Sequence, residues 1–295
     1  ADLLHAYDQA GMVDKSGRTK AATLLMLRRE LGDVKLRDLG AIQLRDFIDR
    51  RQKTAGGVTL AADLSYLGGL LKWARHVRHL DVNVQAALDA RAGLAFRGLS
   101  TRSKERDRIP TADELDRLNK HWQAKPRQKI DMPLLVGFAA ASAMRQGEIC
   151  RLTGADVVVA ERAIWIRDRK HPTDKVGNDQ LVPLLGDAWS IVQERMAECG
   201  EGFLFPWSEK SASTAFTRAA KALGIEDLHF HDLRHHAITN LFRAGLSIEL
   251  VALVSGHRDW KQWRRYTELV TQDEHASYKS AASPPLAAPA PAAAA

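Results

Sequence analysis

Apolar residues recur at helical spacing through the first third of the chain. The periodicity covers residues 19–31, 41–53 and 58–77, and three or four residues separate the members of the clearest stripe, which consists of Leu60, Leu64, Leu67, Leu71 and Ala74. We therefore predict a small helical bundle over residues 1–96, with this leucine stripe as part of its core.

The periodic pattern stops at the end of this region. Residues 97–109 have almost no apolar periodicity, carry many charged side chains and end at Ile109-Pro110, which is typical of an interdomain linker. A second domain begins directly afterwards, because Thr111 is followed three residues later by Glu114, the pattern of a capping box. We expect a helix from there to about Asn119.

The second domain mixes helical and strand-like patterns. An apolar helix is expected around residues 132–143, and the runs 156–160, 163–167 and 180–185 predict a small antiparallel sheet. Residues 170–179 contain Pro172 and Gly177, so we expect a loop that projects from the edge of this sheet.

Helical patterns resume in the last third, over residues 187–199, 213–223 and 232–244, and Ser247 can cap a short helix to about Ser255. Helix-ending glycines follow three of these helices, at Gly224, Gly245 and Gly256. The fold class is therefore mainly α with a small antiparallel β-sheet. It combines a helical-bundle N-terminal domain with a mixed α+β C-terminal domain over residues 110–282, and an Ala/Pro-rich tail occupies residues 283–295.

Charge is unevenly distributed between the two domains. Residues 1–109 contain 20 Lys and Arg against 13 Asp and Glu, whereas residues 110–295 contain 23 of each, so the first third carries the whole net charge of +7. This surplus fits a segment that binds a polyanion, although a solvated basic surface has the same composition.

Other classes of protein fit the sequence poorly. The longest apolar stretch, 133–144, is far shorter than the roughly 20 residues of a membrane span, and no signal peptide is visible. Cys150 and Cys199 cannot form a disulfide framework. We expect a cytoplasmic protein that makes no membrane contact.

Six side chains could together perform chemistry on a phosphodiester. They comprise cations that bind phosphate oxygens, groups that transfer protons and one phenol, and in chain order they are Arg145, Lys170, His231, Arg234, His257 and Tyr266. A tyrosine can attack phosphorus when fixed cations hold the nonbridging oxygens and an acid protonates the leaving alkoxide.

The motifs around these residues resemble those of the tyrosine recombinases, or phage-type integrases. The resemblance rests on Ala-Met-Arg-Gln-Gly-Glu-Ile at 143–149, His-Asp-Leu-Arg-His-His-Ala at 231–237, Leu-Val-Ser-Gly-His at 253–257, and Tyr266. It covers residues 109–278 and, more loosely, the helical domain. The family usually has Leu-Gly-His where this chain has Ser255-Gly256-His257.

The resemblance implies a role for each residue. Tyr266 attacks DNA to form a 3′-phosphotyrosyl link, Arg145 and Arg234 hold the nonbridging oxygens, and His257 donates a further hydrogen bond to the phosphate. His231 acts as general base or positions the nucleophile. The general acid is Lys170 or, on the same loop, Lys175. Glu148 braces Arg145 or His231 from behind, or is simply a helix-surface carboxylate.

The implied reaction is site-specific DNA recombination, whether integration, excision, inversion or resolution. It needs no metal or nucleotide cofactor, because cations and a stored covalent bond replace both. His231 and His235 have the spacing of a zinc-binding pair, but a third ligand is not evident. The alternatives are a type IB-like DNA topoisomerase and a noncatalytic DNA-binding protein on the same fold.

The expected partners follow from the same resemblance. They are double-stranded DNA, three further copies in a homotetramer on two duplexes, and possible accessory DNA-bending proteins, in a bacterial or phage-encoded system at the nucleoid. The basic linker is expected to lie on DNA, together with the Lys175 loop, so the candidate DNA-binding residues are Arg97, Arg102, Lys104, Arg106, Arg108 and Lys175.

Overall fold

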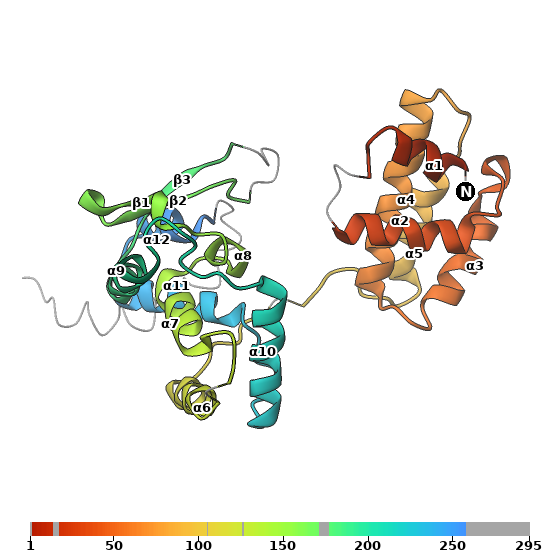
Figure 1. Cartoon of the computed structure of the whole chain (residues 1–295). Helices are drawn as coiled ribbons and strands as arrows, with labels where there is room; N and C mark the ends of the chain where they lie inside the picture. The colour runs from red at the N-terminus through yellow and green to blue at the C-terminus, as the bar shows by residue number, and fades with distance from the viewer. Residues whose placement is uncertain (1, 14–17, 105, 126, 171–176, 258–295) are drawn as a thin grey trace, which may run out of the picture. The chain divides into compact units, whose positions relative to one another are not determined.

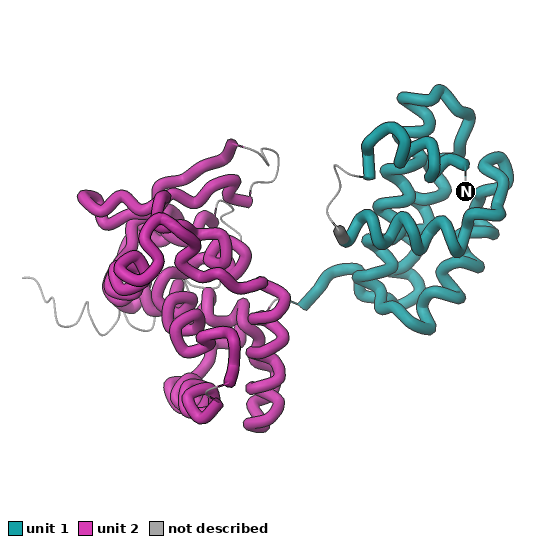
Figure 2. The backbone as a smooth tube through the Cα atoms, in the orientation of Figure 1, with its two compact units in different colours: residues 1–105 teal, residues 106–295 magenta. Residues whose placement is uncertain are grey.

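The chain divides into two compact units, residues 1–105 and residues 106–295 (Figure 2). Each unit has its own hydrophobic core. The division falls inside the segment 97–109 that the sequence predicts as a linker. The structure is a computed structural model, and it describes residues 2–13, 18–104, 106–125, 127–170 and 177–257.

The first unit is helical throughout its regular elements (Figure 1). They are α1 Asp2–Gln9, α2 Arg18–Leu31, a 3₁₀ turn at Leu36–Asp38, α3 Ala41–Arg51, α4 Gly57–Val77 and α5 Val84–Phe96. The three predicted helices are confirmed as α2, α3 and α4, and the leucine stripe of α4 is buried in the core.

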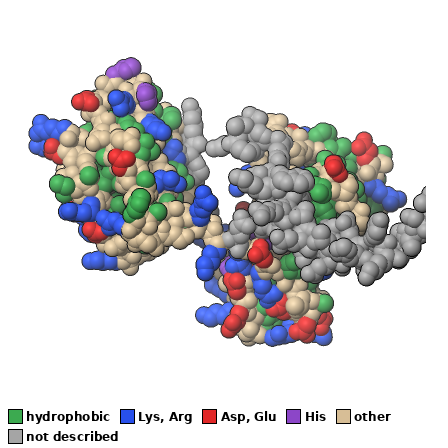
Figure 3. Space-filling model, turned by 180° about the vertical axis from the view of Figure 1, so that it is seen from behind, with side chains coloured by type: hydrophobic (Ala, Val, Ile, Leu, Met, Phe, Trp, Pro, Cys, Tyr) green, Lys and Arg blue, Asp and Glu red, His purple; other side chains and the backbone are tan. Residues whose placement is uncertain are grey.

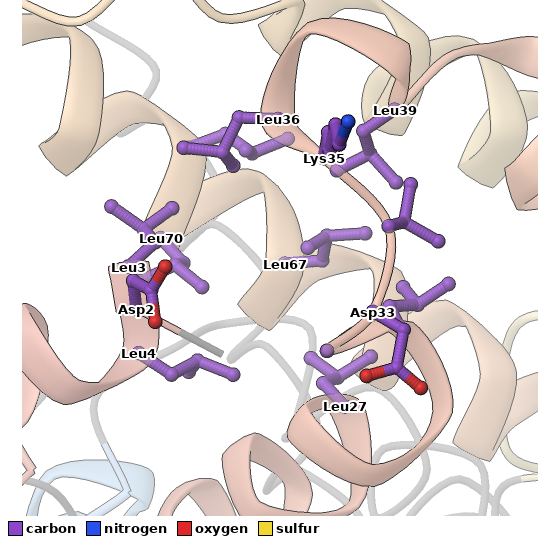
Figure 4. A pocket seen from close by; sticks show the side chains of 14 residues that line it. Asp2, Leu3, Leu4, Leu27, Asp33, Lys35, Leu36, Leu39, Leu67 and Leu70 are labelled. Carbon is purple, nitrogen blue, oxygen red and sulfur yellow. The ribbon is translucent and has the colours of Figure 1, made fainter.

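The sequence pattern missed α1 and α5. The buried face of α5 includes the small residues Ala86 and Ala87, which weaken the apolar periodicity, although Asn83 caps this helix by accepting a hydrogen bond from the backbone N–H of Ala86 at 3.0 Å. A leucine-lined cavity of about 350 Å³ lies among α1, α2, α4 and the 3₁₀ turn, with Leu27 and Leu67 in its wall (Figure 4).

The second unit consists of packed helices with a small sheet at one edge (Figure 1). Its helices are α6 Ala112–Gln123, α7 Met132–Ser142, α8 Gln146–Ile149, α9 Asp187–Cys199, α10 Glu209–Ala222, α11 Asp232–Arg243 and α12 Ile248–Ser255. The predicted fold class is confirmed. The capping box is present as well, because Thr111 Oγ1 accepts from the backbone N–H of Glu114 and the Glu114 carboxylate accepts from that of Thr111.

The sheet is antiparallel, as the sequence predicts. Its strand order is β1-β2-β3. Its strands are β1 Val157–Val158, β2 Ala163–Ile166 and β3 Gln180–Pro183. The first strand is shorter than predicted, because a 3₁₀ turn at Val159–Glu161 and the left-handed Arg162 reverse the chain before β2. The helix α10 begins one turn earlier than predicted, and the four-residue α8 was not predicted.

Within the second unit, α11 packs against α7 and α12, and α12 contacts β3. The ends of α7 and α12 therefore lie close to the first turn of α11. Among the described residues, no helix has the length and apolarity that a membrane crossing requires.

Two glycines offer a matched test of this packing. A Cβ at Gly154 would lie 1.8 Å from the carbonyl oxygen of Gly200, whereas a Cβ at Gly137, on an exposed part of α7, would meet only Ile191 at 3.9 Å. We expect Gly154→Ala to lower the free energy of unfolding by about 1–3 kcal/mol through overpacking. Gly137→Ala should raise it by up to about 1 kcal/mol through helix propensity. Urea denaturation at pH 7 measures both, and equal stabilities would contradict the close packing at Gly154.

Candidate active site

Arg234 forms the buried centre of the site. It lies in the first turn of α11, and only 2% of its surface is exposed. Its Nη1 donates to the carbonyl oxygen of Ala143 at 2.7 Å, and its Nη2 donates to that of Ser255 at 2.8 Å. One guanidinium thus binds the chain at the end of α7 and at the end of α12, so the motifs at 143–149 and 253–257 meet at the motif of 231–237.

His257 lies beside this guanidinium. Gly256 ends α12 in the left-handed conformation, with φ of 68°, and the chain then places His257 Nε2 2.9 Å from Arg234 Nη2. Because a guanidinium can only donate, Nε2 is the acceptor in this pair. The Oγ of Ser255, the residue that departs from the family pattern, lies 3.4 Å from Nδ1 of the same ring.

Arg145 and Glu148 form a second part of the site. Ala143, in the left-handed conformation, ends α7, and two residues later Arg145 is the N-cap residue of α8. The carboxylate of Glu148 accepts from Arg145 Nη1 at 2.7 Å and from the Arg145 backbone N–H at 3.0 Å. Glu148 is 3% exposed, so this carboxylate is a buried brace for Arg145.

The ionisation of Glu148 reflects its neighbours. Burial disfavours the charged form, but the charges of Arg169 and Arg145 and the hydrogen bonds from Arg145 outweigh it and hold the pKa of Glu148 below its ordinary value of 4.5. The carboxylate is therefore ionised at pH 7.

His231 is surrounded by the positive charges of the site. It precedes α11, and the residue remains exposed, but desolvation by the surrounding protein lowers the pKa of its imidazole below the ordinary value of 6.5. The charge of Arg234 lowers this pKa further, against the opposing charge of Asp232, and Arg145 and Lys170 add smaller effects in the same direction. His231 is consequently neutral at pH 7, and the charge of Lys170 acts at this site.

Arg169 is a residue of the site that the sequence did not reveal. It directly precedes Lys170, it is 1% exposed, and its Nε lies 3.6 Å from the Glu148 carboxylate. A buried arginine leaves no signature in a single sequence, because Arg in a basic loop is ordinarily exposed.

The cations of the linker differ in their surroundings. Arg106 is bonded to Asp227 and to the fully buried carboxylate of Asp232, which raises the pKa of Arg106, and Arg108 pairs with Glu114. In the first unit, Arg97 pairs with Asp49. Arg102 and Lys104 are exposed and form no ion pair with any described residue. The predicted DNA contacts of these five residues stay predictions.

Tyr266 and Lys175 lie outside the described residues. Of the predicted site residues that are described, Arg145, His231, Arg234 and His257 lie in one site. Glu148 contacts Arg145 there, and the charge of Lys170 acts on His231. In the described ranges, no three His, Cys, Asp or Glu side chains are grouped as metal ligands. The His231 and His235 rings meet edge to face, with their centroids 5.3 Å apart.

Comparisons with known proteins assign the chain to a family. Residues 109–273 match the phage integrase family, and the chain belongs to that family. The chain is 33% identical over 168 residues to the shufflon-specific DNA recombinase of Escherichia coli, an alignment that covers 57% of this chain and 41% of the relative. The alignment thus spans less than half of the length of this curated relative.

Solved structures share the fold. A lambda integrase dimer bound to a COC′ core site superposes with a TM-score of 0.68 at 20% identity, covering 90% of this chain and 76% of that one. A lambda integrase tetramer bound to a Holliday junction gives a TM-score of 0.67 at 20% identity, covering 89% and 78%. At this identity the likeness establishes the fold of the chain.

Replacing Glu148 tests the buried brace. We expect Glu148→Gln to lower the free energy of unfolding by about 3 kcal/mol at pH 7, because two arginines lose a buried counter-charge. The lowered pKa means that the folded carboxylate stabilises the protein above pH 4.5 and loses this effect as the pH falls through its folded pKa. The difference from the wild type should therefore shrink below pH 4.5. Urea denaturation across pH measures it, with the exposed Glu161→Gln as control, and a difference independent of pH would contradict the ionised brace.

Proposed function

We propose that this chain is a tyrosine site-specific recombinase, which breaks and rejoins DNA strands through a 3′-phosphotyrosyl intermediate. The observation that carries the proposal is the meeting of Arg145, Arg234 and His257 beside a neutral His231. Donors fixed before the substrate binds are suited to stabilise the charge that develops on a phosphate during attack.

The proposed first step is the attack of the Tyr266 phenol oxygen on the scissile phosphorus. A bond forms between the phenol oxygen of Tyr266 and phosphorus, and the bond between phosphorus and the 5′ oxygen breaks. The phenol, with an ordinary pKa of about 10, loses its proton to His231. Lys170 gives a proton to the departing 5′ oxygen. In the second step, the 5′-hydroxyl of another strand attacks the phosphotyrosyl bond and the proton transfers reverse.

Each of the other groups has one role in this scheme. Arg145 and Arg234 donate hydrogen bonds to the nonbridging oxygens, and their guanidinium groups stay charged at every physiological pH. His257 supplies a further hydrogen bond to the phosphate. Because its Nε2 accepts from Arg234 in the free protein, that role requires the proton of His257 to be redistributed when the phosphate binds.

The proposed partner is duplex DNA, with four copies of the chain on two duplexes, because exchange between two sites requires four cleavages. The net positive charge of residues 1–109 supports DNA binding by the first unit, whose Lys and Arg side chains are spread over the face visible in Figure 3. We propose that this unit and the exposed linker residues Arg102 and Lys104 hold the DNA backbone in a bacterial or phage-encoded system of the cytoplasm.

Covalent capture of DNA tests the nucleophile. Nicked duplexes that tile the DNA flanking the gene trap the cleaved strand, because the released fragment diffuses away. We expect a denaturant-resistant adduct with the wild-type chain and none with Tyr266→Phe, which loses only the attacking hydroxyl. Tyr278→Phe is the matched control, since it removes the phenol of the next tyrosine in the sequence. An adduct that survives in Tyr266→Phe and disappears in Tyr278→Phe would overturn the assignment.

Strand exchange separates the proposal from its alternative. A recombinase joins strands from two sites, whereas a type IB-like topoisomerase reseals the original strand and relaxes a supercoiled plasmid as a monomer. Relaxation of plasmids that carry no captured sequence, with no exchange between sites, would favour the topoisomerase.

A further inference from the structure

We infer that Arg169 is a positioning residue that holds Lys170 beside the proposed phosphate-binding groups before DNA arrives. The inference rests on the proposed function, because it assigns to Arg169 the alignment of the proposed general acid. Arg169 does not touch the reacting atoms in this scheme. It acts through the segments that it joins.

The side chain of Arg169 binds the end of α12 and the start of β3. Its Nη1 donates to the carbonyl oxygen of Leu253 and to Gln180 Oε1, both at 3.0 Å, and its Nη2 donates to the carbonyl oxygen of Val254 at 2.7 Å. These carbonyls immediately precede Ser255-Gly256-His257. The same guanidinium thus holds the segment that presents His257.

The main chain of Arg169 is held by Asn178. Its N–H donates to the carbonyl oxygen of Asn178 at 2.8 Å, and its carbonyl oxygen accepts from Asn178 Nδ2 at 2.6 Å. Lys170 is the next residue along the chain. The backbone that leads into Lys170 is therefore held by two sets of contacts, those of the Arg169 side chain and those between Arg169 and Asn178.

Gly256 shows how tightly the guanidinium is held. A Cβ at position 256 would lie 2.5 Å from Arg169 Cζ and 2.6 Å from Nε, closer than real side chains approach. The glycine of this motif is therefore required both by its positive φ and by the guanidinium that lies against it. Arg169 and the Gly256-His257 turn form one packed unit.

Glu148 joins Arg169 to Arg145. Its Oε1 accepts from Arg145 Nη1 at 2.7 Å and lies 3.6 Å from Arg169 Nε. One carboxylate between two guanidinium groups leaves a net positive charge, which favours binding of a phosphate. A shift of Arg169 would therefore move Lys170, His257 and, through Glu148, Arg145 together.

The experiment compares Arg169→Met with Arg167→Met, using single-turnover cleavage of a DNA duplex that the wild type captures. Arg167 lies on the same hairpin, but its side chain is 53% exposed and pairs with Asp156 and Asp179. We expect Arg169→Met to cleave on the order of 100-fold more slowly, as for a catalytic group displaced by about 1 Å, with a much smaller loss of DNA affinity because one positive charge is removed. Arg167→Met should cleave like the wild type.

A second substrate carries sulfur in place of the 5′ bridging oxygen. A thiolate leaves without protonation, so it does not need an aligned general acid. On this substrate the deficit of Arg169→Met should shrink by about tenfold or more. Arg169→Lys should behave like Arg169→Met, because one ammonium cannot reproduce the fork that spans two carbonyl oxygens. Equal cleavage by Arg169→Met and the wild type, or a deficit that is the same on both substrates, would overturn the inference.

Two controls keep the outcomes distinct. If thermal unfolding shows that Arg169→Met does not fold, Gln180→Ala takes its place, because it removes a single hydrogen bond to Arg169. We expect Gln180→Ala to cleave more slowly than the wild type, by a smaller factor than Arg169→Met, and the sulfur-containing substrate should reduce this difference. An unchanged cleavage rate, or a difference that is the same on both substrates, would overturn the inference. If the wild type captures none of the tiled duplexes, the proposed function fails irrespective of Arg169. If the wild type and Arg167→Met react and Arg169→Met reacts equally, only the present inference fails.

Discussion

The buried guanidinium of Arg234 is the constraint on which the site depends. A charge that is 2% exposed is stable only when its donors are satisfied, and here Ala143 and Ser255 provide the carbonyl oxygens. Removing those partners would leave a charge buried without compensation, at a cost of several kcal/mol. Docking of α7 and α12 onto α11 and assembly of the groups that we propose to bind phosphate are therefore one event.

Glu148 and Arg169 extend this assembly towards the sheet. The carboxylate connects Arg145 to Arg169, and Arg169 connects the sheet to the end of α12. Shared polar contacts thereby hold three chain segments together: the segment of Arg145, the segment of Arg169 and the end of α12. Such contacts fix directions as well as distances, which apolar packing alone does not. The cations are therefore oriented in the free protein, as the proposed binding of a phosphate requires.

The sequence was most informative where a pattern has a direct physical cause. The leucine stripe of α4, the Thr111-Glu114 capping box and the glycine that ends α12 each determine local backbone structure, and each prediction was confirmed. The motifs of the site could be recognised because their order and spacing are distinctive. The helix α5 was missed because its buried alanines weaken the periodicity, and β1 is shorter than predicted because an early turn uses the residues that would have extended it.

The coupling between the motifs could not be read from the sequence. The hydrogen bonds of Arg234 to Ala143 and Ser255 use backbone carbonyl oxygens, which every residue type has. The burial of Arg169 depends on the packing of α12 against β3, and the pairing of Arg106 with Asp232 joins positions that are distant in the chain. Linker cations that are alike in sequence therefore differ in the structure, with Arg106 ion-paired and Arg102 exposed.

The most direct test of the account is a crystal structure of the chain captured covalently on DNA. The account predicts that Arg145, Arg234 and His257 all lie within about 3.2 Å of the oxygens of the phosphate joined to Tyr266. It also predicts that Arg234 keeps its bonds to the carbonyl oxygens of Ala143 and Ser255. A phosphate bound in another cleft, or an Arg234 that must leave those carbonyls to reach it, would contradict a site assembled before the substrate binds.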